Sequence, residues 1–370
     1  MSRFLGLLAF LGAAGSLFAQ NPILTCAVSA NPPVVHAEGI TERTGDVVLA
    51  CTGGTPNARV SGNLSLFLSV AVTNRITAAG NPDVGLTIDA GSGPIAANVA
   101  PMLSGNTVAF NGLGFNLSPT GAATLRVSNL RGAASQLGLA VGQSVTVSLA
   151  FNGGSPIAIP SSTFTVATPQ TGFYASFSSK LVCAQNGSPL PSTLNFANLI
   201  AAGTEFTSTR FTEGFASSFV ARADIGNFNA DSGVRVIARY SGFPAGARIF
   251  VPDAITGSDT VQPTAGGDFG PPPSGGQYAA ASGTLLLIRV NGADSTGTGG
   301  ALAFAPPASG TVSFNSVSEI PLTSGAGDAV YEVVDSNPFV IESAQFPTFL
   351  GWAGSTNGAS YQTNETVNLA

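Results

Sequence analysis

Short runs of apolar and β-branched residues recur along the whole chain at intervals of about 8–15 residues, and Gly, Pro, Asn and Ser separate them. Residues 145–151 show the pattern clearly, because Val, Val, Leu and Phe occupy the odd positions with Thr, Ser and Ala between them. Alternation with a period of two is typical of a strand with one buried face. The pattern therefore predicts an all-β protein.

Turn signals support this interpretation. Asn-Gly pairs occur at 111, 152, 186, 291 and 357, and Asn-Gly suits the type I′ turns of β-hairpins because both central residues need positive φ. The strongest hairpin prediction covers residues 107–115, where apolar runs flank Asn111 and Gly112. One short helix is expected over residues 194–202.

A polar, turn-prone stretch at residues 168–172 divides the strand pattern into two halves. Halves of this size predict two tandem antiparallel β-sandwich (Ig-like) domains, the first over residues 20–168 and the second over residues 172–352. The run 263–277 contains three consecutive prolines and is expected to be a surface loop. Residues 353–370 are rich in Gly, Ser, Asn and Thr, which predicts a flexible tail.

The first 19 residues have the pattern of a secretory signal peptide. Arg3 supplies the positive start, residues 4–18 are apolar, and Ala19 is a suitable small residue before cleavage. No later segment is apolar and long enough for a transmembrane helix, which needs about 20 residues. The prediction is a secreted protein, located outside the cell, at the cell surface or in the periplasm.

Export allows disulfide bonds to form. Cys26 and Cys51 both lie in strand-like segments, and a bond between them would close a loop of about 26 residues and contribute roughly 3 kcal/mol. The alternative is two buried free thiols. Cys183 then remains, either as a buried apolar residue or as a partner for another chain.

The composition excludes a nucleic-acid-binding protein and a structural zinc site. Charged residues make up 9% of the chain, against about 25% in a typical domain. A nucleic-acid-binding protein needs a surplus of Lys and Arg, whereas this chain has a net charge of −6. A structural zinc site needs four Cys or His ligands, and the chain has three Cys and one His in all.

Two motifs lie early in the chain, at residues 35–42 and 45–56, and further motifs lie at residues 72–75, 106–112, 126–131 and 211–216. The first two resemble the opening of a large set of secreted acidobacterial proteins of unknown function, and the others suggest the same group. The resemblance implies a β-rich fold and an extracellular location. It supplies no catalytic residues.

Candidate catalytic groups are few. His36 is the only base available for a nucleophilic triad, and we interpret it as a partly exposed strand residue. Paired carboxylates can hydrolyse glycosides, and two groups lie close in sequence: Glu38 with Glu42 and Asp46, and Glu205 with Glu213. Solvated faces explain both groups, so the sequence predicts a protein that is not an enzyme.

The segment 224–233 places oxygen ligands at alternating positions, at Asp224, Asn227, Asn229 and Asp231. Calcium binds such ligands, although an EF-hand counted from Asn227 would need Glu at position twelve, where Ala238 stands. The prediction is a looser calcium site, with a polar turn as the alternative.

Three other residues have candidate roles. Lys180 is the only lysine and could form an isopeptide bond to an Asn if it were buried beside an acid; an exposed strand lysine is the alternative. Trp352 and Tyr361 are candidates for glycan binding, because aromatic faces pack on sugar rings. For Trp352 the alternative is packing against the second domain.

The function predicted is that of a non-catalytic extracellular structural or adhesive protein, which self-associates or binds cell-surface polymers. A carbohydrate-binding module and, less favoured, a secreted hydrolase are the alternatives. Residues 361–370 alternate in polarity, so this segment could be donated as a strand to a neighbouring molecule.

Overall fold

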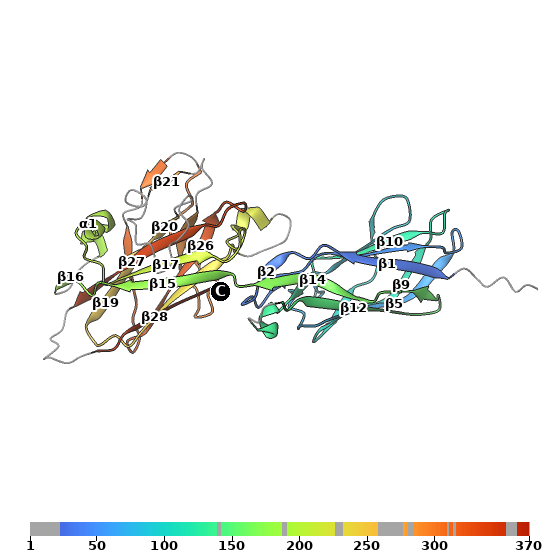
Figure 1. Cartoon of the computed structure of the whole chain (residues 1–370), viewed down its shortest axis with the longest axis horizontal. Helices are drawn as coiled ribbons and strands as arrows, with labels where there is room; N and C mark the ends of the chain where they lie inside the picture. The colour runs from blue at the N-terminus through green and yellow to red at the C-terminus, as the bar shows by residue number, and fades with distance from the viewer. Residues whose placement is uncertain are drawn as a thin grey trace, which may run out of the picture.

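The computed structural model describes residues 23–138, 142–186, 191–225, 232–257, 277–279, 285–308, 311–313, 316–352 and 361–369. Over these residues the chain forms two β-sandwiches that lie end to end (Figure 1). Each sandwich consists of two mainly antiparallel sheets packed on one apolar core. The predicted all-β class with tandem sandwiches is confirmed.

The first sandwich has two six-stranded sheets and a small two-stranded sheet. One large sheet has the order β13 (Ile157–Ala158), β1 (Leu24–Ala30), β4 (Val47–Thr52), β10 (Ala123–Ser128), β6 (Gly85–Asp89) and β7 (Ile95–Ala96). The other has the order β2 (Val34–His36), β14 (Thr163–Gln170), β12 (Val145–Asn152), β5 (Arg59–Leu68), β9 (Thr107–Asn116) and β8 (Pro101–Ser104). The small sheet pairs β3 (Glu42–Arg43) with β11 (Arg131–Gly132), which the 3-10 helix η1 (Ala134–Leu137) follows.

The second sandwich is built in the same way. One sheet has the order β15 (Phe173–Ser179), β17 (Thr207–Glu213), β27 (Ser343–Trp352), β19 (Ala247–Pro252) and β25 (Val317–Ile320), with β16 (Cys183–Asn186) beside β27. The facing sheet has the order β20 (Ala254–Thr256), β22 (Leu286–Asn291), β26 (Gly327–Asp335), β18 (Arg235–Ser241) and β28 (Asn364–Leu369), with β23 (Ala301–Leu302) beside β22. The remaining elements are β21 (Gln277–Ala279) paired with β24 (Thr311–Ser313), the helix α1 (Phe196–Ala201), and the 3-10 helices η2 (Pro191–Thr193) and η3 (Arg222–Ile225).

The alternating pattern at residues 145–151 becomes strand β12. Val145, Val147 and Leu149 are buried in the first core, while Thr146 and Ser148 between them are only partly buried. Period-two burial is what a strand between a core and solvent requires. Here the prediction from the sequence is confirmed.

The Asn111–Gly112 pair does not form the predicted hairpin. Strand β9 runs straight through both residues and pairs with β5 on either side of them. Asn111 and Gly112 together lie opposite Asn63, where the register shifts, and Gly112 has a φ of 72°. Two residues against one is the geometry of a β-bulge. The same φ preference that favours a turn also favours this bulge, so the local sequence could not separate them.

The predicted disulfide is confirmed. Cys26 of β1 and Cys51 of β4 are directly paired across the two strands and joined by a disulfide, and both side chains are buried in the first core. Cys183 carries a free thiol and is exposed at the start of β16. The expectation that Cys183 is a buried apolar residue is therefore wrong: it lies on a short strand whose described pairing is with β27 alone, and its side chain is exposed.

Replacing both Cys26 and Cys51 by Ala is expected to lower the free energy of unfolding of the first sandwich by about 3 kcal/mol, because the unfolded chain gains the freedom of the opened loop. Denaturant titration followed by circular dichroism measures this change. Cys183→Ser is the matched control and should leave both unfolding transitions where they are. A double variant as stable as the parent protein would show that the cross-link does not constrain the unfolded chain.

Residues 364–369 differ from the expectation of a flexible tail. They form β28, which pairs with all of β18 from Val236 to Ser241. Val367 is buried in the second core, so this strand completes the sandwich to which it belongs. The segment considered for donation to a neighbour is thus paired within its own chain. Residues 1–22, 353–360 and most of the proline-rich run 263–277 lie outside the described residues.

Candidate functional site

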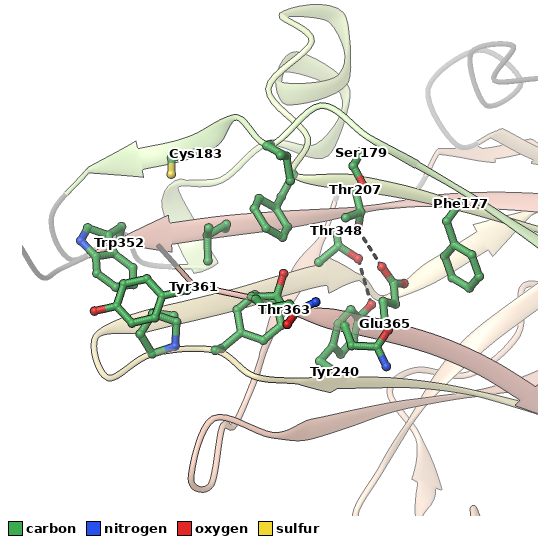
Figure 2. Close-up of a pocket in the computed structure, with 18 residues that line it drawn as sticks. Phe177, Ser179, Cys183, Thr207, Tyr240, Thr348, Trp352, Tyr361, Thr363 and Glu365 are labelled. Carbon is green, nitrogen blue, oxygen red and sulfur yellow. Dashed lines mark hydrogen bonds between the residues drawn. The ribbon is translucent and has the colours of Figure 1, made fainter. Parts of the chain in front are cut away.

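A groove of about 870 Å³ opens in the second sandwich where strands β15 and β28 form neighbouring edges of the two facing sheets (Figure 2). Thr348, Leu350 and Trp352 line it from alternate positions of β27, and Phe177 and Ser179 do the same from β15. Successive side chains of a strand point to opposite faces, so alternate residues share one wall. The groove is therefore formed by the core-facing rows of both sheets where the sandwich is open.

Two aromatic rings lie side by side at one end of the groove. The centroids of Trp352 and Tyr361 are 6.0 Å apart and the ring planes meet at 46°. Tyr361 is 50% exposed. The Trp352 Nε1 atom is buried and has no hydrogen-bond partner among the described residues. The structure thus brings together the two residues considered for glycan binding.

A polar group forms the other end of the groove (Figure 2). The Glu365 carboxylate accepts hydrogen bonds from the hydroxyls of Thr207 at 2.7 Å and Thr209 at 2.5 Å. Tyr240 pairs with Glu365 across strands β18 and β28, and its hydroxyl lies 2.9 Å from that of Thr348. Burial raises the pKa of Glu365, and the threonine hydroxyls only partly oppose this. Sequence reasoning did not select Glu365, because its position in a groove depends on where β28 pairs.

The only histidine lies at the junction of the two sandwiches and not in the groove. The His36 Nδ1 atom is 3.1 Å from Oε1 of Glu42 in the first sandwich. The Nε2 atom is 2.8 Å from the carbonyl oxygen of Ser218, on the loop that follows β17, and the ring also contacts Phe215. Both ring nitrogens have partners, so His36 joins the two sandwiches through hydrogen bonds.

Glu38 reinforces the same junction. Its carboxylate accepts the backbone N–H of Gly172 at 2.9 Å, and the carbonyl of Gly172 accepts the N–H of Gly214 at 2.8 Å. A Cβ atom at Gly172 would lie only 2.3 Å from the His36 ring, which explains the need for glycine. Two of the motifs that carried the resemblance, residues 35–42 and 211–216, therefore meet at this junction.

The His36 ring should titrate above its ordinary pKa. Burial lowers the pKa, but the hydrogen bond and charge of Glu42 and the Ser218 carbonyl outweigh it, and the net shift is upward from 6.5. The histidinium then stabilises the junction fully below pH 6.5, and this contribution is lost as the pH rises through the folded-state pKa. NMR titration of the single imidazole measures the value without assignment ambiguity. Glu42→Gln should lower the pKa and Glu319→Gln should not; an apparent pKa at or below 6.5 in the parent protein would contradict the geometry.

The carboxylates that are close in sequence have separate partners. Glu42 contacts His36, Glu38 contacts Gly172, and Asp46 accepts a hydrogen bond from the Arg126 Nε at 2.8 Å. Among the described residues, Glu42 and Asp46 line one cavity of about 860 Å³ together with His36, whereas Glu38 is not part of its lining. Each acid has a structural contact of its own, so the interpretation as solvated faces is too simple.

Glu205 precedes β17 and Glu213 is its last residue, so the two acids are at opposite ends of the strand and do not form a pair. Glu205 lies 2.5 Å from the Lys180 Nζ, and Lys180 is half exposed, unlike a buried isopeptide lysine. Glu213 is buried beside Glu342. The structure therefore replaces the pair expected from sequence by one that joins β17 to the start of β27.

The Glu213 and Glu342 carboxylates accept hydrogen bonds from four backbone N–H groups. Glu213 accepts the N–H groups of Phe219 at 2.7 Å and Glu342 at 2.9 Å. Glu342 accepts those of Asn337 at 2.8 Å and Leu285 at 3.0 Å. Burial raises the pKa of each carboxyl to about 7, and for Glu342 the charge of Glu213 adds to this effect. Both acids are occupied by the backbone, so the pair stabilises the end of the sandwich that faces the junction.

The candidate calcium residues remain a prediction. Asp224 lies in the 3-10 helix η3, while Asn227, Asn229 and Asp231 lie outside the described residues. The described part of the chain contains no cluster of three His, Cys, Asp or Glu side chains arranged to hold a metal ion. It also contains no helix that is long and apolar enough to cross a membrane.

No protein-family model matches the chain, and no curated protein matches it. Among solved structures, the partial N-terminal region of an enterococcal surface protein aligns over 97% of this chain and 93% of its own, with a TM-score of 0.25 and 9% identity. Red sea bream transglutaminase aligns over 93% of this chain and 31% of its own, with a TM-score of 0.22 and 10% identity. The N-terminal CBM22-1-CBM22-2 tandem domain from Paenibacillus barcinonensis Xyn10C covers 93% of this chain and 94% of its own, with a TM-score of 0.17 and 7% identity.

Scores this low carry no argument about function, and the resemblance to acidobacterial proteins stays a prediction. The groove itself is the feature of this chain that bears on its function.

Proposed function

We propose that this protein is a non-catalytic, secreted adhesive protein, and that it adheres by holding a saccharide in the groove of the second sandwich. The observation that carries the proposal is the Trp352–Tyr361 ring pair in an open groove. Aromatic side chains offer large rigid apolar faces at low entropic cost and dominate the energetics of many binding sites. The faces of sugar rings are apolar and their edges carry hydroxyls, which matches rings at one end and hydroxyls at the other.

The described lining of the groove contains no pair of carboxyl groups, which supports the non-catalytic part of the proposal. Glycoside hydrolysis uses two carboxyl groups about 5–9.5 Å apart. Among the described residues that line the groove, Glu365 carries the one carboxylate, and both of its oxygens already accept hydroxyl protons. The only histidine is engaged at the junction.

Trp352→Ala is expected to reduce retention of the protein on the saccharide that binds it by roughly tenfold or more, as expected for a central aromatic residue. Pull-down on a panel of insoluble polysaccharides measures retention. Tyr174→Ala is the matched control, because Tyr174 is 62% exposed on β15 but does not line the groove. If the parent protein is retained on no polysaccharide, the proposal is wrong.

Self-association is a second candidate function, and the β15 edge favours it. Strand β15 pairs with β17 on one side only, has no charged residue, and exposes Tyr174 and Phe177. Uncharged edges invite pairing with another chain. Light scattering at increasing protein concentration tests this candidate, and a constant monomer mass would remove it.

A further inference from the structure

The groove contains, among its described lining residues, one acidic side chain and no basic side chain to pair with it. No Lys, Arg or His is among its described lining residues, and Glu365 is the only acid. Residues 353–360, which connect Trp352 to Tyr361, contain no charged residue in the sequence. The nearby Lys180 is paired with Glu205. None of these residues therefore gives the Glu365 carboxylate a cationic partner, and such a partner would have to come from a ligand.

The surroundings of Glu365 favour such a cation. The Thr207 and Thr209 hydroxyls donate to its two oxygens, but hydroxyls offset only part of what a carboxylate loses when water is removed. Opposite charge within hydrogen-bond reach stabilises a partly buried carboxylate much more than neutral donors do. The aromatic walls add to this, since the faces of Tyr and Trp rings attract cations.

The separation between the aromatic end and the acidic end of the groove indicates what a ligand needs besides a positive charge. The Trp352 and Tyr361 rings lie at one end of the groove and Glu365 at the other, with Thr363 between them (Figure 2). A small amine would contact only one end. A ligand that uses both ends needs flat apolar faces, hydroxyls that pair with threonine side chains, and a positive group.

We propose that the groove selects a saccharide that carries free amino groups, with an ammonium group paired to the Glu365 carboxylate and a sugar ring packed on Trp352 and Tyr361. This inference rests on the proposed function and names its ligand class. N-acetylation of the same sugar removes the positive charge and leaves the ring faces unchanged. Acetylated and free amino sugars therefore separate charge recognition from ring packing.

The test uses the fluorescence of Trp352, which is the only tryptophan in the chain and lines this groove. The mature protein is titrated at about pH 6 with tetramers of glucosamine, N-acetylglucosamine and glucose. The glucosamine tetramer is expected to bind at least tenfold more tightly than the other two. Glu365→Gln keeps the shape of the side chain, and is expected to abolish that preference while binding of the neutral tetramers persists.

Two controls keep the result interpretable. Asp328→Asn removes the same charge from β26 outside the groove and should preserve the preference. A tetramer of lysine tests whether charge alone is sufficient, and it should bind more weakly than the glucosamine tetramer.

The remaining outcomes separate a failure of this inference from a failure of the proposed function. Equal binding of the three sugars, or a preference that survives in Glu365→Gln, would overturn the inference and leave the proposed function standing. Tighter binding of the lysine tetramer would overturn the choice of a saccharide. Binding of none of the sugars, together with no retention on any polysaccharide, would overturn both proposals.

Discussion

Arg235→Ala is expected to lower the free energy of unfolding of the second sandwich by about 3–5 kcal/mol, the usual cost of breaking a buried ion pair on one side. The Arg235 Nη2 atom lies 2.8 Å from Oε2 of Glu332, and both side chains are about nine-tenths buried. Arg235 also donates to the carbonyls of Gly297 and Gly299. The substitution leaves a buried carboxylate and two carbonyls without their partner.

The two sandwiches make this measurement selective. Trp352, the only tryptophan, belongs to the second sandwich, so its fluorescence follows that unfolding transition, while circular dichroism follows both. The first sandwich should unfold at an unchanged denaturant concentration. Combining Arg235→Met with Glu332→Leu should recover part of the loss, because no charge then remains buried. A loss below about 1 kcal/mol in Arg235→Ala would show that water reaches Glu332.

Glu213→Ala is expected to destabilise the second sandwich by a similar amount, because it leaves two buried N–H donors, those of Phe219 and Glu342, without acceptors. Each orphaned donor costs roughly 1–3 kcal/mol. Glu319→Ala removes a carboxylate that is only partly buried and should cost far less. The comparison is made by the same fluorescence-detected denaturation.

The same carboxyl pair predicts how stability depends on pH. The pKa values of Glu213 and Glu342 are about 7 in the folded chain against an ordinary 4.5, so between these values the folded state binds more protons than the unfolded one. Stability from the pair is therefore fully present below pH 4.5 and falls as the pH rises towards 7. The slope approaches about 1.4 kcal/mol per pH unit for each group, and it should be reduced in Glu213→Gln. Stability of the second sandwich that rises with pH over this range would contradict the assignment.

Local sequence patterns were sufficient to predict a strand where the alternation within that strand alone indicates which of its residues are buried. Period-two alternation identified β12, and the turn-prone stretch at residues 168–172 lies where β14 gives way to β15. The pairing of Cys26 with Cys51 was also predictable, because the sequence offers two cysteines in strand-like segments and one far away. The same patterns gave a wrong prediction at Asn111–Gly112, because a hairpin turn and a β-bulge both favour a residue with positive φ.

The amino-acid sequence by itself determined the all-β class and strands such as β12, and it favoured the disulfide, because these depend on alternation and spacing within short segments. Only the tertiary structure decided which acids meet, since Glu213 and Glu342 come together across 129 residues. It also decided the groove, which depends on the pairing of β28 with β18 and of β15 with β17. Contacts between distant strands depend on the order of strands in the sheet and on their register. The periodicity of a single strand carries no information on either.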